Sequence, residues 1–312
     1  MKLPFDFATK LILRLVLPGA ILTATLWPLV SAGLIFLGVS FNVPLTAAVS
    51  IMLLGWLTLL LDMPIYMFFE GRRFWPERLR KWGIGRESAR LQSIVSKSSS
   101  AQQAGQSALE LDLQTLSFPL GANGEPEARY PTRLGNLITA FEEYPLRKYG
   151  LDGTFVWPRL LVSIDKDLRS ELDDQQAVAD SALYVTAALV VVSICCIVYA
   201  FLAATYPSGL PALPSSETLA AVSAASAALA YGLYRLSLFR QAQYGDMFAA
   251  TFDQHRSKID WSSLAKDLTS FMGDNQTTYL SPQDINRGAV RFLKWHQYRK
   301  IGTTKNETVR GW

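Results

Sequence analysis

Hydrophobic positions along the chain gather into four long runs that alternate with polar segments. Residues 15–38, 181–206 and 218–234 contain no charged side chain, and residues 43–69 contain only Asp62. A helix needs roughly 20 apolar residues to cross the hydrocarbon core of a bilayer. The fourth run is richer in Ala and Ser than the others, yet it is close to that length. The pattern predicts an all-α, polytopic membrane protein with four transmembrane helices arranged as two hairpins.

The limits of these runs divide the chain into five predicted segments. An interfacial N-terminal segment (1–14) leads into a first transmembrane hairpin (15–69), a cytoplasmic helical domain (70–180), a second transmembrane hairpin (181–234) and a cytoplasmic helical C-terminal region (235–312). The polar segments are long enough in total to build a hydrophobic core of their own.

Two polar segments carry amphipathic patterns next to the runs. Basic residues alternate with Phe74, Trp75 and Trp82 at the start of the predicted cytoplasmic domain. Because Trp favours the headgroup level and Arg extends its charge to water, we expect a membrane-surface helix there. Helical spacing continues from the fourth run into 235–264, which should pack on the cytoplasmic domain. A basic helix over 281–300 should dock on the core or on anionic lipid, and the last dozen residues should be disordered.

The segment 131–160, which begins PTRLGN and ends WPRL, combines turn residues with aromatic and basic side chains. Thr132 is expected to cap a helix, which Pro145 helps to end. Gly150 should supply a positive φ in the following turn. Pro158 occupies a first-turn position of the next helix, which should run on into the third apolar run. The segment therefore predicts a compact helix–turn–helix corner beside the membrane.

This corner is a candidate structural or partner-binding site. Arg133, Glu142, Arg147 and Arg159 either form an ion network that fixes it or make scattered surface pairs, each worth well under about 1 kcal/mol. The candidate residues of the corner are Arg133, Asn136, Glu142, Arg147, Tyr149, Asp152, Trp157 and Arg159.

The distribution of basic residues predicts the orientation of the chain. Of the 30 Lys and Arg, 3 lie in residues 1–14, 15 in residues 70–180 and 12 in residues 235–312. The connections at LGVSFN and TYPSGLPALPSSET contain none. Since cytoplasmic loops hold the Lys and Arg excess, both termini should be cytoplasmic, in a bacterial inner membrane. A basic face beside anionic lipid explains the net charge of +4, so no nucleic acid is expected as a partner.

Three charged residues near the ends of the runs need separate interpretation. If the second run is helical to its end, Asp62 lies inside the membrane as a pore-lining or other functional carboxylate. If the span stops near Leu61, Asp62 belongs to a turn at the interface. Asp253 and Arg256, three residues apart, are expected to pair on one helix.

The residue types that perform catalysis are sparse. The two cysteines, Cys195 and Cys196, are adjacent on a predicted helix and point about 100° apart, so they are poor disulfide or metal partners. His255 and His296 are far apart in the chain, and no metal-ligand spacing occurs. There is no GxSxG, HExxH or Walker motif. The sequence therefore predicts a protein that is not an enzyme, with no catalytic residue, metal or cofactor.

Two stretches resemble a known group of proteins. PTRLGN…E-x-YP…YG-x-D…WPRL (131–160) and YGDMFAATFDQHR (244–256) resemble bacterial four-span membrane proteins of uncharacterised function, which carry a cytoplasmic insertion between their second and third spans. That resemblance implies a topology and no chemistry. YMFFEGRRFW (66–75) is similar, over ten residues, to the point where bestrophin-type anion channels leave the membrane. That second resemblance implies a pentameric channel.

These observations lead to two hypotheses about function. The first is a non-enzymatic membrane protein whose cytoplasmic domain binds a protein partner or a signal and couples it to the spans, as a scaffold, a sensor or a stress or phage-defence effector. The second is an oligomeric ion channel or pore. In both, the lipid bilayer is a partner and homo-oligomers are expected. Ala220, Ala224 and Ala228 form a row of small residues suited to tight helix packing, either between copies or within one chain.

Overall fold

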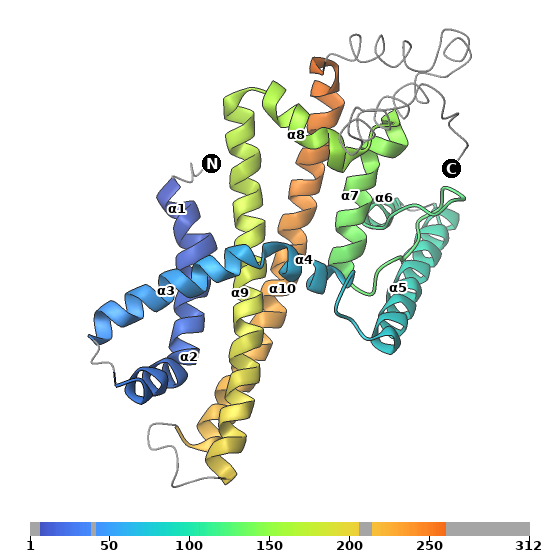
Figure 1. The fold of residues 1–312 in the computed structure, drawn as a ribbon. Helices are drawn as coiled ribbons and strands as arrows, with labels where there is room; N and C mark the ends of the chain where they lie inside the picture. The colour runs from blue at the N-terminus through green and yellow to red at the C-terminus, as the bar shows by residue number, and fades with distance from the viewer. Residues whose placement is uncertain (1–6, 39–41, 106, 206–213, 260–312) are drawn as a thin grey trace, which may run out of the picture. The chain divides into compact units, whose positions relative to one another are not determined.

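The computed structural model describes residues 7–38, 42–105, 107–205 and 214–259, and within these ranges every regular element is helical. One isolated antiparallel bridge joins Leu120 to Pro126. The all-α prediction is confirmed for this part of the chain, whereas the helix predicted over 281–300 lies outside it. The elements are α1 (Phe7–Leu11), the π-helical η1 (Ile12–Val16), α2 (Leu17–Phe36), α3 (Val43–Leu60), α4 (Asp62–Glu70), α5 (Glu77–Gln103), α6 (Leu109–Thr115), α7 (Arg133–Tyr149), α8 (Gly153–Ser163), α9 (Lys166–Thr205), α10 (Ser216–His255) and the 3₁₀ turn η2 (Arg256–Lys258) (Figure 1).

Four helical stretches are long and apolar enough to cross a membrane: Thr9–Phe36, Val43–Leu60, Lys166–Thr205 and Ser216–Lys258. Each overlaps one of the four uncharged or nearly uncharged runs of the sequence. The prediction of four helices with the length and composition of membrane spans is therefore confirmed.

The first apolar stretch is irregular at a proline. Pro18 has no N–H to donate to the carbonyl of Arg14, and the preceding residues Ile12–Val16 form a π-helical turn that absorbs the interruption. Pro28 is a second break inside α2, and the axis of α2 changes direction along its length in Figure 1. The chain therefore kinks where proline removes a hydrogen bond.

The second apolar run is not one helix to its end. Leu61 leaves the helical conformation with φ −89° and ψ 12°, so that α3 ends at Leu60 and α4 begins at Asp62. The physical cause is Pro64, which cannot donate to the carbonyl of Leu60. A single span over 43–69 is therefore replaced by an 18-residue helix and a separate short one.

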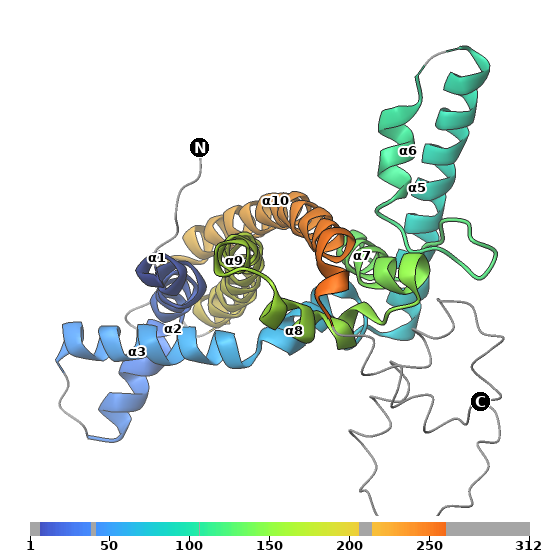
Figure 2. The ribbon, with the colours of Figure 1, turned by 90° about the horizontal axis from the view of Figure 1, so that it is seen from above.

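Two glycines bring α2 and α3 into close contact. A Cβ on Gly19 would lie 2.2 Å from the carbonyl oxygen of Ile51, and a Cβ on Gly55 would lie 2.2 Å from that of Leu15. Only glycine allows the two backbones to approach this closely. From this crossing α3 runs across the helices α9 and α10 rather than along them (Figures 1 and 2).

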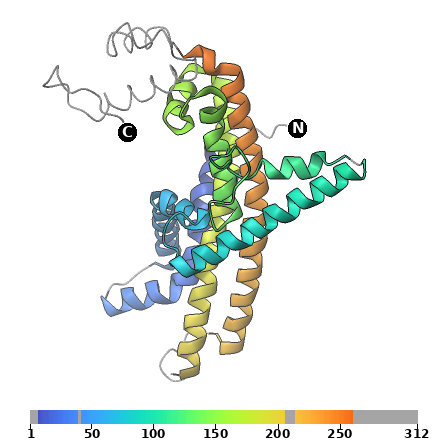
Figure 3. The ribbon, with the colours of Figure 1, turned by 90° about the vertical axis from the view of Figure 1, so that its right-hand side faces the viewer.

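Helices α9 and α10 lie side by side and antiparallel, as the second predicted hairpin requires (Figures 1 and 3). The Ser193 and Ser223 hydroxyls lie 3.0 Å apart across this contact. Cys196 packs with Tyr199 and Leu219 in one cluster of the same hairpin. Each helix has 40 residues, or about 60 Å, which is twice the thickness of a hydrocarbon core.

Helix α3 buries small side chains and exposes large apolar ones. The buried positions of α3 are Ser50, Gly55 and Thr58, whereas Trp56 and Leu60 are exposed. On α10, similarly, the serines face inward while large apolar residues face outward. A folded protein in water does not expose contiguous apolar surface of this kind, and lipid is the solvent that would tolerate it.

The described chain divides into two compact units. The first unit contains Met1–Ala140 and Asp167–Met247, and the second contains Phe141–Lys166 and the chain from Phe248 onward. The predicted segment 70–180 is thus shared between them. Within the first unit, α5 and α6 form an antiparallel arm (Figure 2), with Leu91, Ile94, Phe118 and Ala128 in its core.

Candidate functional site

The most connected polar site of the first unit lies where charged segments meet the apolar runs. We call it the Asp180 cluster. It comprises Arg14, Asp62, Tyr66, Asp180, Tyr184 and Gln241, contributed by η1, α4, α9 and α10.

Asp180 is the centre of this cluster. Its carboxylate accepts hydrogen bonds from Arg14 Nη2 at 2.6 Å and from the Tyr66 hydroxyl at 2.5 Å. The Tyr66 oxygen in turn accepts from Gln241 Nε2 at 2.6 Å. Asp180 is only 5% exposed, and a buried carboxylate persists only when it is paired and hydrogen-bonded in this way.

Asp62 belongs to the same cluster through Tyr184, whose hydroxyl donates to Asp62 Oδ1 at 2.7 Å. Asp62 is the first residue of α4, directly after the break at Leu61. Asp62 therefore does not lie in the middle of one continuous helix over 43–69.

A second set of ion pairs extends the contact between the N-terminal helix and α9. Lys10 Nζ pairs with Asp173 and lies 2.7 Å from Asp174, while Arg14 Nη1 lies 3.8 Å from Asp173. Lys10 and Arg14 are one turn apart, and Asp173 and Asp180 share one face of α9 two turns apart. The arrangement ties the start of the first apolar helix to the charged end of the third.

Of this cluster, sequence reasoning identified only Asp62. Arg14 is the last charge before the first run, and Asp180 is the last charge before the third, so their places at the run ends were a visible signal. What joins them is a contact between residues 166 positions apart, which no local pattern contains.

The first half of the predicted corner, PTRLGN, is a packed junction between α4, α5 and α7. A Cβ on Gly71 would lie 2.2 Å from Pro131, and one on Gly83 would lie 2.5 Å from the same ring. Gly135 faces the backbone of Glu70, where a Cβ would meet the carbonyl oxygen at 2.1 Å. These three glycines are therefore required by close packing rather than by a ligand.

The remaining polar residues of PTRLGN fix the start of α7. The Thr132 hydroxyl accepts from the Gly135 N–H at 3.0 Å, which confirms the predicted cap. The Asn136 side chain is 1% exposed, accepts from the N–H groups of Arg129 and Tyr130, and donates to two carbonyls. Asn136 thus satisfies backbone groups of the preceding loop that would otherwise be buried without partners.

In the second unit, Asp253 gathers the polar side chains of the corner. Its carboxylate accepts from the Tyr144 hydroxyl at 2.8 Å and the Tyr149 hydroxyl at 2.5 Å, and Lys148 Nζ lies 3.1 Å away. Arg256 donates to the Asp253 backbone oxygen and stacks over the Tyr149 ring at 4.2 Å. This contact uses the backbone oxygen of Asp253, and so differs from the side-chain ion pair on one helix that the sequence predicted; α10 ends at His255 and Arg256 lies in η2.

These contacts shift the acid–base properties of the site. Burial raises the pKa of Asp253, but hydrogen bonds from Tyr149, Tyr144 and Lys148 outweigh it and lower that pKa below its ordinary value. The pKa of Lys148 is raised by its hydrogen bonds to Tyr144 and Asp253. Asp253 follows the uncharged run 218–234 in the sequence and lies outside it. Both groups are thus charged at neutral pH.

An aromatic core holds the same unit together. Trp157 packs on Phe248 at 4.5 Å and stacks on Phe252 at 5.8 Å between ring centroids. Phe141 lies 5.6 Å from Phe248. Trp157 is therefore a core residue of this unit rather than an exposed anchor.

Two predicted helix boundaries in the corner are wrong. Helix α7 continues through Pro145 to Tyr149, where Gly150, with φ +72°, ends it as predicted. Helix α8 begins at Gly153, because the Asp152 side chain accepts from the Phe155 N–H at 3.0 Å and caps it earlier than expected.

Pro158 therefore sits inside α8, not in its first turn. The extended backbone of Ile164 ends α8 before α9 begins at Lys166, so no continuous helix runs from Pro158 into the third apolar run.

The arginines of the expected ion network have individual partners. Arg133 Nε lies 3.8 Å from Glu87, and Arg147 pairs with Glu143 one turn away. Arg159 donates to the carbonyl oxygen of Phe155 and lies over its ring. Glu142 approaches the second helix through its backbone, since a Cβ on Gly153 would lie 2.6 Å from the Glu142 carbonyl oxygen.

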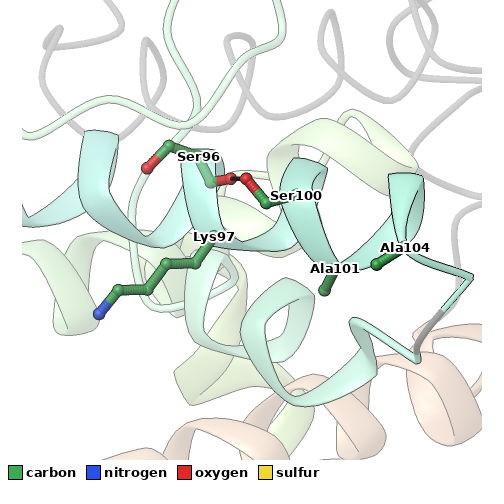
Figure 4. Close-up of a pocket in the computed structure, with 5 residues that line it drawn as sticks. All are labelled: Ser96, Lys97, Ser100, Ala101 and Ala104. Atoms are coloured by element: carbon green, nitrogen blue, oxygen red, sulfur yellow. Dashed lines mark hydrogen bonds between the residues drawn. The ribbon is translucent and has the colours of Figure 1, made fainter.

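No enclosed reaction site emerges from the described residues. The hollow in Figure 4 is shallow and lies on one helix, with Ser96, Lys97, Ser100, Ala101 and Ala104 around it. The Ser100 hydroxyl bonds to the Ser96 carbonyl, and Lys97 points away from both serines. Within the part of the chain that is described, no three His, Cys, Asp or Glu residues are grouped to hold a metal ion. Cys195 and Cys196 are free thiols.

Comparison of the chain with protein-family models, with curated proteins and with solved structures finds no match. The described geometry consists of ion pairs that tie an N-terminal helix to α9 and of two long helices that continue from apolar into charged sequence.

Proposed function

We propose that this chain is a multi-pass protein of a bacterial inner membrane, whose cytoplasmic helices bind a protein partner or a signal and transmit it to the membrane. One observation carries the proposal. Helices α9 and α10 each have 40 residues, so neither is interrupted between its apolar half and its charged half. In α9, whose residues 167–205 belong to the first unit, a displacement of the charged half would move the apolar half as a rigid rod. Such a protein acts as a scaffold, a sensor or a stress or phage-defence effector, not as an enzyme.

The proposed topology has two hairpins with both termini and residues 70–180 in the cytoplasm. It is supported by the 30 Lys and Arg, all of which lie outside the four apolar runs and their two short connections. Outward-facing apolar side chains on α3, α9 and α10 support contact with lipid or with further copies of the chain. A homo-oligomer fits these surfaces, because it would cover part of them.

The Asp180 cluster supplies a switch for this coupling. Arg14 and Lys10 hold the beginning of the first apolar helix to α9 through Asp180, Asp173 and Asp174. A partner that displaced the charged half of α9 would strain these ion pairs and so act on the first apolar helix. The cluster thus connects two of the proposed spans at their cytoplasmic ends.

Reporter fusions test the topology one hairpin at a time. A reporter that is active only outside the cytoplasm should be active when it is inserted within 207–213, and again when it is inserted within 39–41. Activity at 207–213 with silence at 39–41 would keep the second hairpin and reject the first. Silence at 207–213 would reject the orientation.

Cross-linking in native membranes tests the binding function. The intact protein should be recovered with a reproducible protein partner or as a self-assembled oligomer. Recovery of the monomer alone, under conditions that cross-link a known membrane oligomer, would contradict the proposal.

An oligomeric ion channel is the second candidate function. The observation in its favour is the placement of two carboxylates, Asp62 and Asp180, where apolar helices meet charged sequence. Liposomes that contain the purified protein should then release chloride or potassium but retain a small dye. Asp62→Asn should change the selectivity, and unchanged currents would remove Asp62 from this hypothesis. Release of the dye as well would indicate a membrane-disrupting effector.

A further inference from the structure

Arginines surround one buried carboxylate at the junction of α5 and α7. Glu87 is 1% exposed, and Arg90 Nη1 donates to it at 3.1 Å. Arg133 Nε lies 3.8 Å from the Glu87 carboxylate, and Arg86 Nη2 lies 3.9 Å from it. Three guanidinium groups therefore share one negative charge.

A fourth arginine, Arg235, lies close to the same group. The ring of Tyr234 stacks on Phe69 at the end of α4, with 6.1 Å between centroids, and the end of α4 packs on the start of α7 at Pro131. The pKa of Arg133 is lowered by burial, then by the positive charge of Arg90, and further by that of Arg235, against the opposing effect of Glu87. Arg235 itself has no ion pair among the described residues.

The charge of this arginine group is not balanced within the described chain. Three guanidinium groups lie within 4 Å of one carboxylate. Guanidinium groups present forks of N–H donors that match phosphate oxygens. The side chains of Arg86, Arg90 and Arg133 are 62%, 28% and 32% exposed, so guanidinium N–H donors remain available to a ligand. The missing partner is expected to be an anion.

The position of the group favours an anion that belongs to the bilayer. Arg235 directly follows the uncharged run 218–234, which places it at the headgroup level of the proposed topology. Trp82, 63% exposed on the outer side of α5, carries Arg86 over its ring at 5.3 Å. An exposed Trp next to arginines is the pattern of a membrane interface, where the ring enters the headgroup layer.

We propose that Arg86, Arg90, Arg133 and Arg235, with Trp82 beside them, form a binding site for the phosphate headgroup of an anionic phospholipid. The headgroup would bridge α5, α7 and α10 and balance the arginines that Glu87 leaves unpaired. This site deepens the proposed function and rests on its topology, because it makes the coupling between these helices depend on the lipid composition.

Lipid titration of the full-length protein tests the site. Native mass spectrometry should show tighter binding of phosphatidylglycerol than of phosphatidylcholine. The double variant Arg90→Gln/Arg133→Gln should weaken phosphatidylglycerol binding by about fivefold for each arginine removed and leave phosphatidylcholine binding unchanged. The control Lys97→Gln/Lys166→Gln removes the same charge from other parts of the chain and should bind like the wild type.

Several results would overturn this site. Equal phosphatidylglycerol affinity in the wild type and the double variant would do so, as would an equal loss in the control, which would mean that only net charge matters. If the double variant does not fold, Arg235→Gln, at an exposed residue outside the ion pairs, should still weaken phosphatidylglycerol binding by about fivefold.

Two further experiments distinguish a lipid ligand from a free anion, and a failure of this site from a failure of the proposed topology. Excess inorganic phosphate should not displace phosphatidylglycerol, and its displacement would identify a free anion as the ligand and contradict the lipid assignment. Failure of lipid binding with an active reporter at 207–213 would contradict this site alone, whereas a silent reporter would contradict the proposed topology.

Discussion

The contact between α2 and α3 and the second unit bury opposite kinds of side chain. In the second unit, Leu151, Val156, Leu160 and Phe252 are buried, while charges such as Asp165 face outward. On α3, Ser50, Gly55 and Thr58 are buried, while Trp56 and Leu60 face outward. The second unit is held together by the burial of large apolar side chains, and the contact between α2 and α3 by close backbone packing.

This difference changes which substitution is costly in each region. Removing a large apolar side chain should be expensive in the second unit and inexpensive on the outer surface of the apolar helices. Adding a single methyl group, or removing one polar partner, should instead be expensive where those helices meet.

The largest effect is expected in the aromatic core. Phe252→Ala removes a ring that is 0% exposed and stacks on Trp157, so it should destabilise the second unit by about 3–5 kcal/mol. Proteolysis of the purified protein under native conditions should then cut within 141–166. The matched control is Phe201→Ala, at a ring 66% exposed on α9, which should leave the cleavage pattern unchanged. Equal effects of the two substitutions on the cleavage pattern would contradict the proposed difference between the two regions.

Next in size is the loss of charge at the Asp180 cluster. Asp180→Asn weakens the hydrogen bonds from Arg14 and Tyr66 and should cost about 1.5–3 kcal/mol, measured by thermal unfolding in a mild detergent. Asp167→Asn, at an exposed position on the same helix, should cost less than about 1 kcal/mol. A loss no larger for Asp180→Asn than for Asp167→Asn would show that the cluster does not join these helices.

A glycine pair on α2 tests the packing of the apolar helices. Gly19→Ala places a Cβ 2.2 Å from the Ile51 carbonyl oxygen and should destabilise the crossing by about 1–3 kcal/mol. Gly33→Ala meets nothing within 4 Å and should be neutral or slightly stabilising, because alanine favours helix. Cross-linking of cysteines introduced on α2 and α3 would report the crossing, and equal yields in both variants would contradict it.

The smallest expected effect concerns pH in the second unit. The lowered pKa of Asp253 means that its contribution to stability is complete above its unfolded value and is lost as pH falls through its folded value. Because Asp253 is partly exposed, the loss should be below about 1 kcal/mol. Tyrosine fluorescence during acid titration should show a step below about pH 4, the ordinary range of Asp, that is absent in Asp253→Asn.

Local features of the fold were predictable, and long-range ones were not. The four apolar runs, the Thr132 cap and the Gly150 turn each depend on residues within a few positions. The helix boundaries predicted at Pro145 and Pro158 were wrong, because a helix can pass through proline when its neighbouring turns are packed and capped.

The candidate sites depend on contacts between distant residues. The Asp180 cluster joins η1, α4, α9 and α10, and the arginine group joins α5 to α7. Each of these residues alone resembles an ordinary surface charge in the sequence. Only the folded chain shows which charges are buried together.

The most direct test of the central claim is cysteine accessibility along α10 in native membranes. In a background with Cys195→Ser and Cys196→Ser, a single cysteine replaces either Leu229 or Ala250, both of which face outward on this helix. A membrane-impermeant maleimide should label the cysteine at 250 only when the cytoplasmic face is accessible, and the cysteine at 229 should remain unlabelled from both sides. Equal labelling of the two positions would contradict a helix that leaves the bilayer and continues unbroken into the cytoplasm.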